Sequence, residues 1–145
     1  VPAPEGVDAY LESALAMQAR GTAWAFAVRD ARGEVVGSTR YYDMDASVPR
    51  LQIGYTFYAP RVQGTGLNTQ AKLLLLAHAF ERMGCISVGF ETSWFNLASR
   101  AAIARLGARQ DGVLRNHRRH ADAPPALEQQ PACALGAVIV CPLAR

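Results

Sequence analysis

Two glycines stand directly before a leucine-rich stretch in RVQGTGLNTQAKLLLL, residues 61–76. Gly64 and Gly66 allow unusual backbone dihedral angles and close approach to a ligand. The first N–H groups of a helix that follows have no partner inside the helix, and the helix dipole favours negative charge there. The turn could therefore hold an anion such as a pyrophosphate. On spacing alone, an ordinary strand-to-helix turn with Asn68 or Thr69 as the helix cap is an equally good interpretation.

Two familiar phosphate-binding motifs do not fit this turn. A P-loop requires a lysine after its glycines, and no lysine stands in that register. A dinucleotide-binding fingerprint requires a third glycine where Thr69 stands, and it opens a parallel βαβ unit. The strands expected before this turn are antiparallel. Both motifs are therefore excluded.

Residues 51–107 closely resemble the acetyl-CoA-binding core of the GNAT (Gcn5-related) N-acetyltransferase superfamily. The nearest branch is the Rim-type one, which includes ribosomal-protein alanine N-acetyltransferases. The superfamily signature is [QR]-x-x-G-x-[GA], and QGTGLN at 63–68 fits it, with Asn68 in the final position. A register that begins at Arg61 satisfies the pattern literally, but the first register puts the helix start in its usual place. The resemblance implies acetyl-CoA as cosubstrate, with its pyrophosphate bound by backbone N–H groups of the turn.

The second matching stretch is FETSWFNLASRAAIARLGA, residues 90–108. In the family, an asparagine at the position of Asn96 lies near the pantetheine arm of the cofactor. Asn96 is also a suitable N-cap for the helix that follows, and the two roles are compatible. The residues that the resemblance assigns to cofactor binding are Gln63, Gly64, Thr65, Gly66, Leu67, Asn68, Thr69 and Asn96.

The resemblance also implies two catalytic residues, Glu91 and Ser99. Some Rim-type enzymes carry a glutamate at the position of Glu91 as general base, because the acceptor amine must lose a proton before it attacks the thioester. For the general acid that reprotonates the CoA thiolate, many members have a tyrosine where Ile103 stands, and Ser99 matches the serine of another Rim-type branch. The alternatives are a solvated strand carboxylate for Glu91 and a helix serine bonded to backbone for Ser99.

The elements that must position these residues follow from the spacing of apolar residues and from turn residues. In chain order we expect a helix over 7–19, a hairpin over 22–45, a strand over 51–60, a helix from the glycine turn to Gly84, a strand over 85–94, a helix over 96–107, a strand from 108, a loop over 121–137 and a short last strand, AVIV. This order predicts an α+β (mixed α/β) fold with a central, mostly antiparallel sheet flanked by helices on both faces. The GNAT-type fold adds a V-shaped splay between the strands that end near Tyr58 and Glu91.

Helical spacing also predicts which side chains are buried. The first helix places Val7, Tyr10, Leu11, Ala14 and Leu15 on one face. The buried stripe expected for the second helix is Leu73, Leu76, Ala77, Phe80 and Met83.

The chain has 145 residues, 50% of them hydrophobic, which suits one domain with a sizeable core. A formal charge of +3 is too small to indicate a nucleic-acid partner. Three cysteines without CxxC spacing, together with three histidines, argue against a metal site and suit a reducing compartment. The sequence shows neither an apolar run of about 20 residues nor a secretory signal. We therefore expect a cytoplasmic monomer or homodimer with no membrane association.

Both ends of the sequence depart from the family pattern. Rim-type enzymes usually begin with a further strand and helix, and their last strand contains D-G-x-x-R-D-T, which residues 121–145 lack. We therefore expect one GNAT domain over 1–145 without the family's first strand and helix. The expected activity is transfer of acetyl from acetyl-CoA to a primary amine, on a protein N-terminus or a small molecule, by direct attack in a ternary complex. The alternative is a non-catalytic or degenerate CoA-binding GNAT domain.

Overall fold

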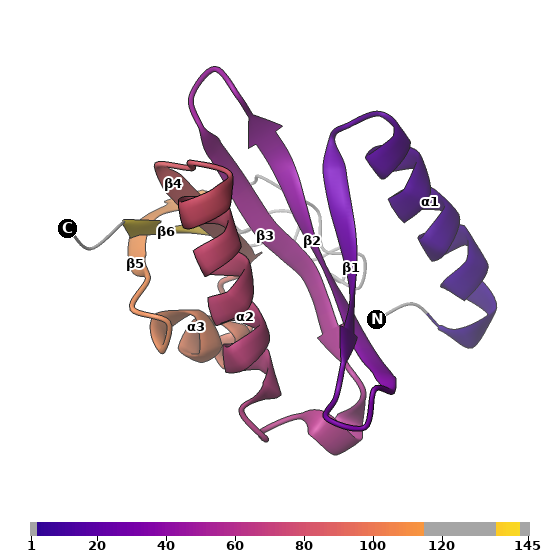
Figure 1. Cartoon of the computed structure of the whole chain (residues 1–145). Helices are drawn as coiled ribbons and strands as arrows, with labels where there is room; N and C mark the ends of the chain where they lie inside the picture. Colours follow the sequence, from indigo (N-terminus) through magenta and orange to yellow (C-terminus); the bar gives the residue numbers. More distant parts are fainter. Residues whose placement is uncertain (1–2, 115–135, 143–145) are drawn as a thin grey trace, which may run out of the picture.

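The computed structural model describes residues 3–114 and 136–142, and within them six strands form one sheet in the order β1-β2-β3-β4-β6-β5 (Figure 1). The strands are β1 (Ala23–Arg29), β2 (Val35–Asp45), β3 (Arg50–Tyr58), β4 (Ser87–Ser93), β5 (Arg109–Leu114) and β6 (Gly136–Pro142). The helices are α1 (Val7–Ala19), α2 (Leu67–Ala77) and α3 (Leu97–Ala104), with short 3-10 helices η1 (Pro4–Gly6) and η2 (Pro60–Val62) and a π-helical continuation of α2, η3 (His78–Arg82).

The sheet is mostly antiparallel, as predicted. The pairs β1–β2, β2–β3, β4–β6 and β5–β6 are antiparallel, and β3–β4 is parallel. The predicted hairpin over 22–45 is confirmed by β1 and β2, and the predicted last strand lies within β6. The predicted loop over 121–137 is wrong at its end, because β6 begins at Gly136; residues 121–135 lie outside the described residues.

Helices cover both faces of the sheet. The contacts of two neighbouring residues in β2 demonstrate this. Adjacent residues of a strand point to opposite faces. The hydroxyl of Tyr41 donates to the carbonyl of Leu75 in α2, whereas the guanidinium of Arg40 lies 4.4 Å from the ring centre of Tyr10 in α1. α1 and α2 therefore pack on opposite faces (Figure 1). No helix in the described part of the chain is long and apolar enough to cross a membrane.

The parallel pair β3–β4 is short, and this produces the expected splay. The paired residues run only from Arg50–Ser87 to Gln52–Gly89. Beyond them, β3 stays paired with β2 and β4 stays paired with β6. A register shift between β2 and β3, with Tyr55 at a φ of 52°, bends β3 in the same region. The two central strands consequently separate toward the ends that carry Tyr58 and Glu91.

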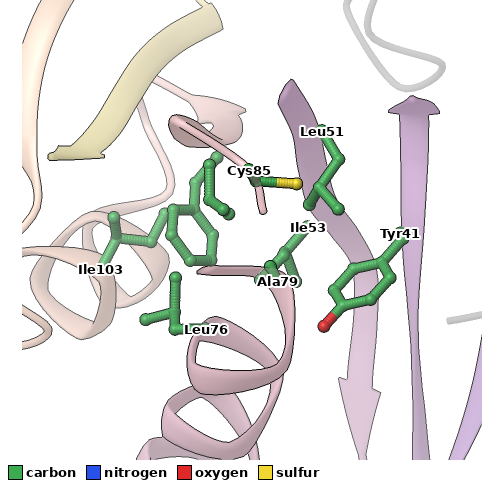
Figure 2. Close-up of a cluster of buried hydrophobic side chains, with 9 residues drawn as sticks. Tyr41, Leu51, Ile53, Leu76, Ala79, Cys85 and Ile103 are labelled. Atoms are coloured by element: carbon green, nitrogen blue, oxygen red, sulfur yellow. The ribbon is translucent and has the colours of Figure 1, made fainter. Parts of the chain in front are cut away.

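The core lies between the sheet and the helices α2 and α3, on the face of the sheet that α2 covers. Its buried residues are Tyr41, Leu51, Ile53, Leu76, Ala79, Cys85, Val88, Phe90 and Ile103 (Figure 2). Burial of each large apolar side chain stabilises the fold by about 1.5–3 kcal/mol. Burial also raises the pKa of Tyr41 to about 12. The cluster joins α2, α3, β2, β3 and β4, so it fixes both sides of the splay relative to each other.

The predicted buried faces of the two helices are only partly right. In α1, Val7, Leu11 and Leu15 are exposed, and Ala14 is buried. In α2, Leu76 is buried, but Leu73 is 53% exposed and Ala77 is exposed. Four consecutive leucines leave the rotation of the helix undetermined, since nearly any face would be apolar. Packing selects the face that carries Lys72, Leu76 and Ala79.

Candidate functional site

The glycine turn adopts a conformation that suits glycine. Gly64 has a φ of 75° and Gly66 a φ of 85°, both in the left-handed region. Gly66 is the N-cap of α2, and no side chain caps the helix. The expectation that Asn68 or Thr69 is the cap is therefore wrong, because the helix begins earlier, at Leu67. The first N–H groups of α2 consequently remain available to an anion.

Side chains anchor the turn and leave the space around the glycines open. The Gln63 amide donates to the carbonyl of Tyr58 at 2.9 Å, and the Thr65 hydroxyl donates to the carbonyl of Val62 at 2.7 Å. A Cβ placed on Gly64 or Gly66 would meet no other atom within 4 Å. The turn is therefore tied to β3 and η2 by these two hydrogen bonds, with room for a ligand beside the glycines.

A cavity of about 750 Å³ extends from this turn to the opening between β3 and β4. Its walls come from β3, the start of α2, β4 and α3, and its volume lies in the range of small-molecule sites. The cavity brings together most of the residues that the sequence assigned to the site: Gln63, Gly64, Gly66, Asn68, Thr69, Glu91, Asn96 and Ser99. Thr65 and Leu67 do not line it.

Asn96 has the capping role expected from the sequence. Its side-chain oxygen accepts the backbone N–H of Ser99 at 3.0 Å, at the start of α3. The preceding turn is fixed by Arg100, whose guanidinium lies 3.8 Å from the ring centre of Trp94 and donates to the Trp94 carbonyl. Asn96 and Ser99 therefore occupy a fixed position at the rim of the cavity.

Glu91 and Ser99 approach the cavity from different sides of the sheet. Phe90 packs in the core with Ile103 of α3, on the α2 face. Glu91 follows Phe90 in β4 and therefore points to the opposite face. Ser99 is on α3, on the α2 face. The cavity thus has a carboxylate on one side of the splay and a hydroxyl on the other, an arrangement that can serve two reactants entering from opposite faces.

Sequence reasoning missed Lys72, which also lines the cavity. Lys72 is only 5% exposed, and its Nζ donates to the hydroxyls of Thr39 at 2.8 Å and Thr56 at 2.7 Å. Burial lowers the pKa of Lys72 to about 7. A lysine next to four leucines in LNTQAKLLLL was the available signal, but its burial depends on how the helix is rotated.

Two tyrosines of β3 to which the sequence assigned no role, Tyr55 and Tyr58, also line the cavity. Burial raises the pKa of Tyr58. Cys85 lies in the core, where burial raises the pKa of its thiol. Among the described residues, no group of three or more His, Cys, Asp or Glu side chains is arranged to hold a metal ion.

Residues 1–109 match the family model described as "Acetyltransferase (GNAT) domain". No curated protein matches the sequence significantly. Among solved structures, a proposed acetyltransferase from T. thermophilus is 29% identical with a TM-score of 0.79, covering 98% of this chain and 69% of that chain. A proposed ribosomal-protein-serine acetyltransferase from Vibrio cholerae is 17% identical with a TM-score of 0.78, covering 97% of this chain and 75% of that chain.

A third solved structure contains a bound CoA derivative. Mycobacterium smegmatis RimJ in complex with CoA-disulfide is 19% identical with a TM-score of 0.76, covering 96% of this chain and 62% of that chain. At these identities, the second and third structures demonstrate a shared fold. The present chain spans only part of the length of each of the three proteins.

Proposed function

The chain belongs to the family of GNAT acetyltransferase domains, and from this premise we propose that it transfers acetyl from acetyl-CoA to a primary amine by direct attack in a ternary complex. The observation that carries the proposal is the cavity of about 750 Å³, which joins the uncapped N-terminus of α2 to the splay between β3 and β4. A long, anionic cosubstrate would have its charged end at the turn and its reactive end between the strands.

The turn would bind the CoA pyrophosphate through backbone N–H groups at Gly64, Gly66 and the first turn of α2. Hydrogen bonds to charged groups contribute about 1.5–3 kcal/mol each. The helix dipole adds about 0.3–1 kcal/mol for an anion at this end. Asn96, which lines the same cavity, would contact the pantetheine arm.

The reaction would proceed without a covalent enzyme intermediate. The nitrogen of the neutral acceptor amine attacks the thioester carbonyl carbon, the C–S bond breaks, and CoA leaves as a thiolate. We propose Glu91 as the base that accepts a proton from the amine, and Ser99 as a hydroxyl acting on the cofactor side. Backbone donors of the splayed strands would polarise the carbonyl. Holding both reactants in place can lower the barrier by about 7–11 kcal/mol.

The acceptor and the cellular context are part of the same proposal. We propose an acceptor amine on a protein N-terminus or a small molecule, which is consistent with the ribosomal-protein-serine acetyltransferase among the structural neighbours. We further propose that residues 1–145 act as a single domain in the cytoplasm, without a metal ion, as a monomer or homodimer.

A second candidate function is a non-catalytic CoA-binding domain. Ile103 favours it, because this buried apolar side chain lines the cavity and cannot donate a proton. Calorimetry with acetyl-CoA and CoA tests the binding that both functions share, and absence of binding at millimolar ligand would refute both. A thiol-release assay with N-terminal peptides, polyamines and aminoglycosides separates them. Binding without CoA release from any acceptor would favour the non-catalytic function.

A further inference from the structure

Lys72 is the only lysine in the chain, and all other residues counted as Lys or Arg are arginines. Its Nζ lies within 2.7–2.8 Å of two hydroxyls, Thr39 of β2 and Thr56 of β3, and 6.0 Å from the ring centre of Phe90 in β4. Thr56 and Phe90 stand beyond the last paired residues of the two central strands. The amine is therefore placed where β3 and β4 separate, beside the cavity that Lys72 lines.

Among the residues that the structure describes, no carboxylate pairs with this buried amine. No ion pair of the described residues includes Lys72, and its hydrogen-bond partners, Thr39 and Thr56, are neutral. The titratable or charged groups that line the same cavity are Tyr55 and Tyr58 on β3, Glu91 on β4 and Arg105 after α3. Burial of an ammonium with only hydroxyl partners destabilises the fold, and a methionine or leucine would fill the same place without that cost.

Lysine and arginine differ in whether this position can release a proton. Arginine stays charged under all ordinary conditions, whereas a buried lysine can titrate near neutral pH. Burial lowers the pKa of Lys72 to about 7. Strongly perturbed groups inside a cavity are candidates for chemistry rather than for structure.

Acetyl transfer needs a proton source for the leaving sulfur that is more acidic than the hydroxyl of Ser99. Breaking the C–S bond generates a thiolate, and a free thiol has a pKa of about 8.5. A group that is somewhat more acidic than the thiol protonates it favourably. Ile103 cannot donate, and the hydroxyl of Ser99 is a much weaker acid than a thiol, so it can orient the sulfur but is not the source of the proton. Burial raises the pKa of Tyr58, and Glu91 is engaged as the proposed acceptor of the amine proton. The ammonium of Lys72 meets the requirement.

We propose that Lys72 is a catalytic residue whose ammonium group donates a proton to the sulfur of CoA as the thiolate leaves. This assignment rests on the proposed function. The new C–N bond forms as the C–S bond breaks, the electron pair of that bond moves to sulfur, and the Nζ proton follows it. The attacking nitrogen becomes positively charged as the C–N bond forms, loses one proton to Glu91 and keeps the other as the amide N–H, and neutral Lys72 regains a proton from solvent.

The test is a titration of the thiol of bound CoA, measured by the ultraviolet absorbance of the thiolate against protein alone. A neighbouring ammonium stabilises the thiolate only while Lys72 is protonated, which burial limits to pH values up to a pKa of about 7. We therefore expect part of the bound thiol to ionise near pH 7 in the native protein, and the thiol of Lys72→Met to ionise in one step near its ordinary pKa of about 8.5. A control variant, Arg29→Met, removes an exposed cation from β1 and should leave the bound thiol unchanged. Because Lys72 is the only lysine, isotope-labelled lysine gives one side-chain NMR signal that follows the same titration directly.

Turnover provides the second measurement. Lys72→Met should lower kcat by about 100-fold or more, without weakening acetyl-CoA binding, and Lys72→Arg should not restore it, because a guanidinium does not release a proton. If the amine of Lys72 had only a structural role, Lys72→Met would instead melt at a lower temperature than the native protein.

The outcomes separate this assignment from the proposed function. If the bound thiol titrates identically in the native protein and Lys72→Met, the role of Lys72 is refuted, whatever the turnover. If the thiol pKa differs as expected but no amine is acetylated, the proposed function fails, while the placement of Lys72 beside the sulfur stands. If CoA does not bind at all, both are refuted.

Discussion

Replacing Gly66 with alanine would test the anion-binding turn. Gly66 has a φ of 85° and is the N-cap of α2. A Cβ at this position meets no other atom within 4 Å, so the methyl group would enter open space beside the cavity. A left-handed conformation costs a non-glycine residue roughly 1–2 kcal/mol. Gly66→Ala should therefore destabilise the fold moderately and also obstruct the approach of a phosphate to the helix N-terminus.

A second glycine provides a matched control. Gly33, in the turn between β1 and β2, has a φ of 80°, and a Cβ there also meets nothing within 4 Å, but it does not line the cavity. Gly33→Ala should lower the free energy of unfolding by a similar amount. Any difference between the two variants in CoA affinity consequently reports on the ligand, and not on backbone strain.

The expected loss of affinity follows from the hydrogen bonds at the turn. Losing one bond between a backbone N–H group and a phosphate removes about 1.5–3 kcal/mol, which raises the Kd about 10- to 150-fold. Isothermal titration calorimetry should show this loss for CoA in Gly66→Ala, no loss for CoA in Gly33→Ala, and no loss in either variant for pantetheine, which lacks the pyrophosphate. If the two variants bind CoA with the same Kd, the turn does not hold the phosphate.

Three further predictions concern other residues of the site. Asn96→Ala removes the cap that accepts the N–H of Ser99, so thermal unfolding should show a loss of about 0.5–2 kcal/mol; an unchanged melting temperature would contradict the capping role. Burial lowers the pKa of Lys72 to about 7, against about 10.4 when unfolded, so the unfolded chain binds more protons between these values and the free energy of unfolding should rise with pH in this window. Denaturant unfolding at several pH values should show this rise, and Lys72→Met should remove the part of the rise that the titration of Lys72 causes. Glu91→Gln should lower kcat by about 100-fold or more with acetyl-CoA binding unchanged, whereas Glu81→Gln, outside the cavity, should not; equal rates would remove Glu91 as the base.

The parts of the fold that depend on near neighbours in the chain could be predicted from the sequence. The hairpin of β1 and β2 and the cap at Asn96 are set by residues a few positions apart. The glycine turn belongs to the same class, since its backbone conformation is encoded by Gly64 and Gly66. These features, together with the resemblance of 51–107, were sufficient for the fold, and most of the site residues predicted from them line the cavity.

Tertiary packing determined which face of an element is buried where the sequence made several faces equally suitable. The run of leucines after Lys72 gave α2 no preferred apolar face, so only packing against β2, β3 and β4 determined its rotation. The same rotation buries Lys72 against Thr39 and Thr56, residues that lie far away in the sequence. The cap at Gly66, rather than Asn68, likewise follows from how the turn is anchored to β3.

The sequence by itself therefore determined the kind of site, a glycine turn before a helix and a strand bearing Glu91, because short-range backbone preferences and turn chemistry are local. Only the tertiary structure decided that the two central strands separate beyond Gln52 and Gly89, and that a lone lysine stands where they part. Burial and electrostatic environment are properties of the assembled core. A lysine that would be an ordinary cation on an exposed helix face becomes a group that can exchange a proton near neutral pH.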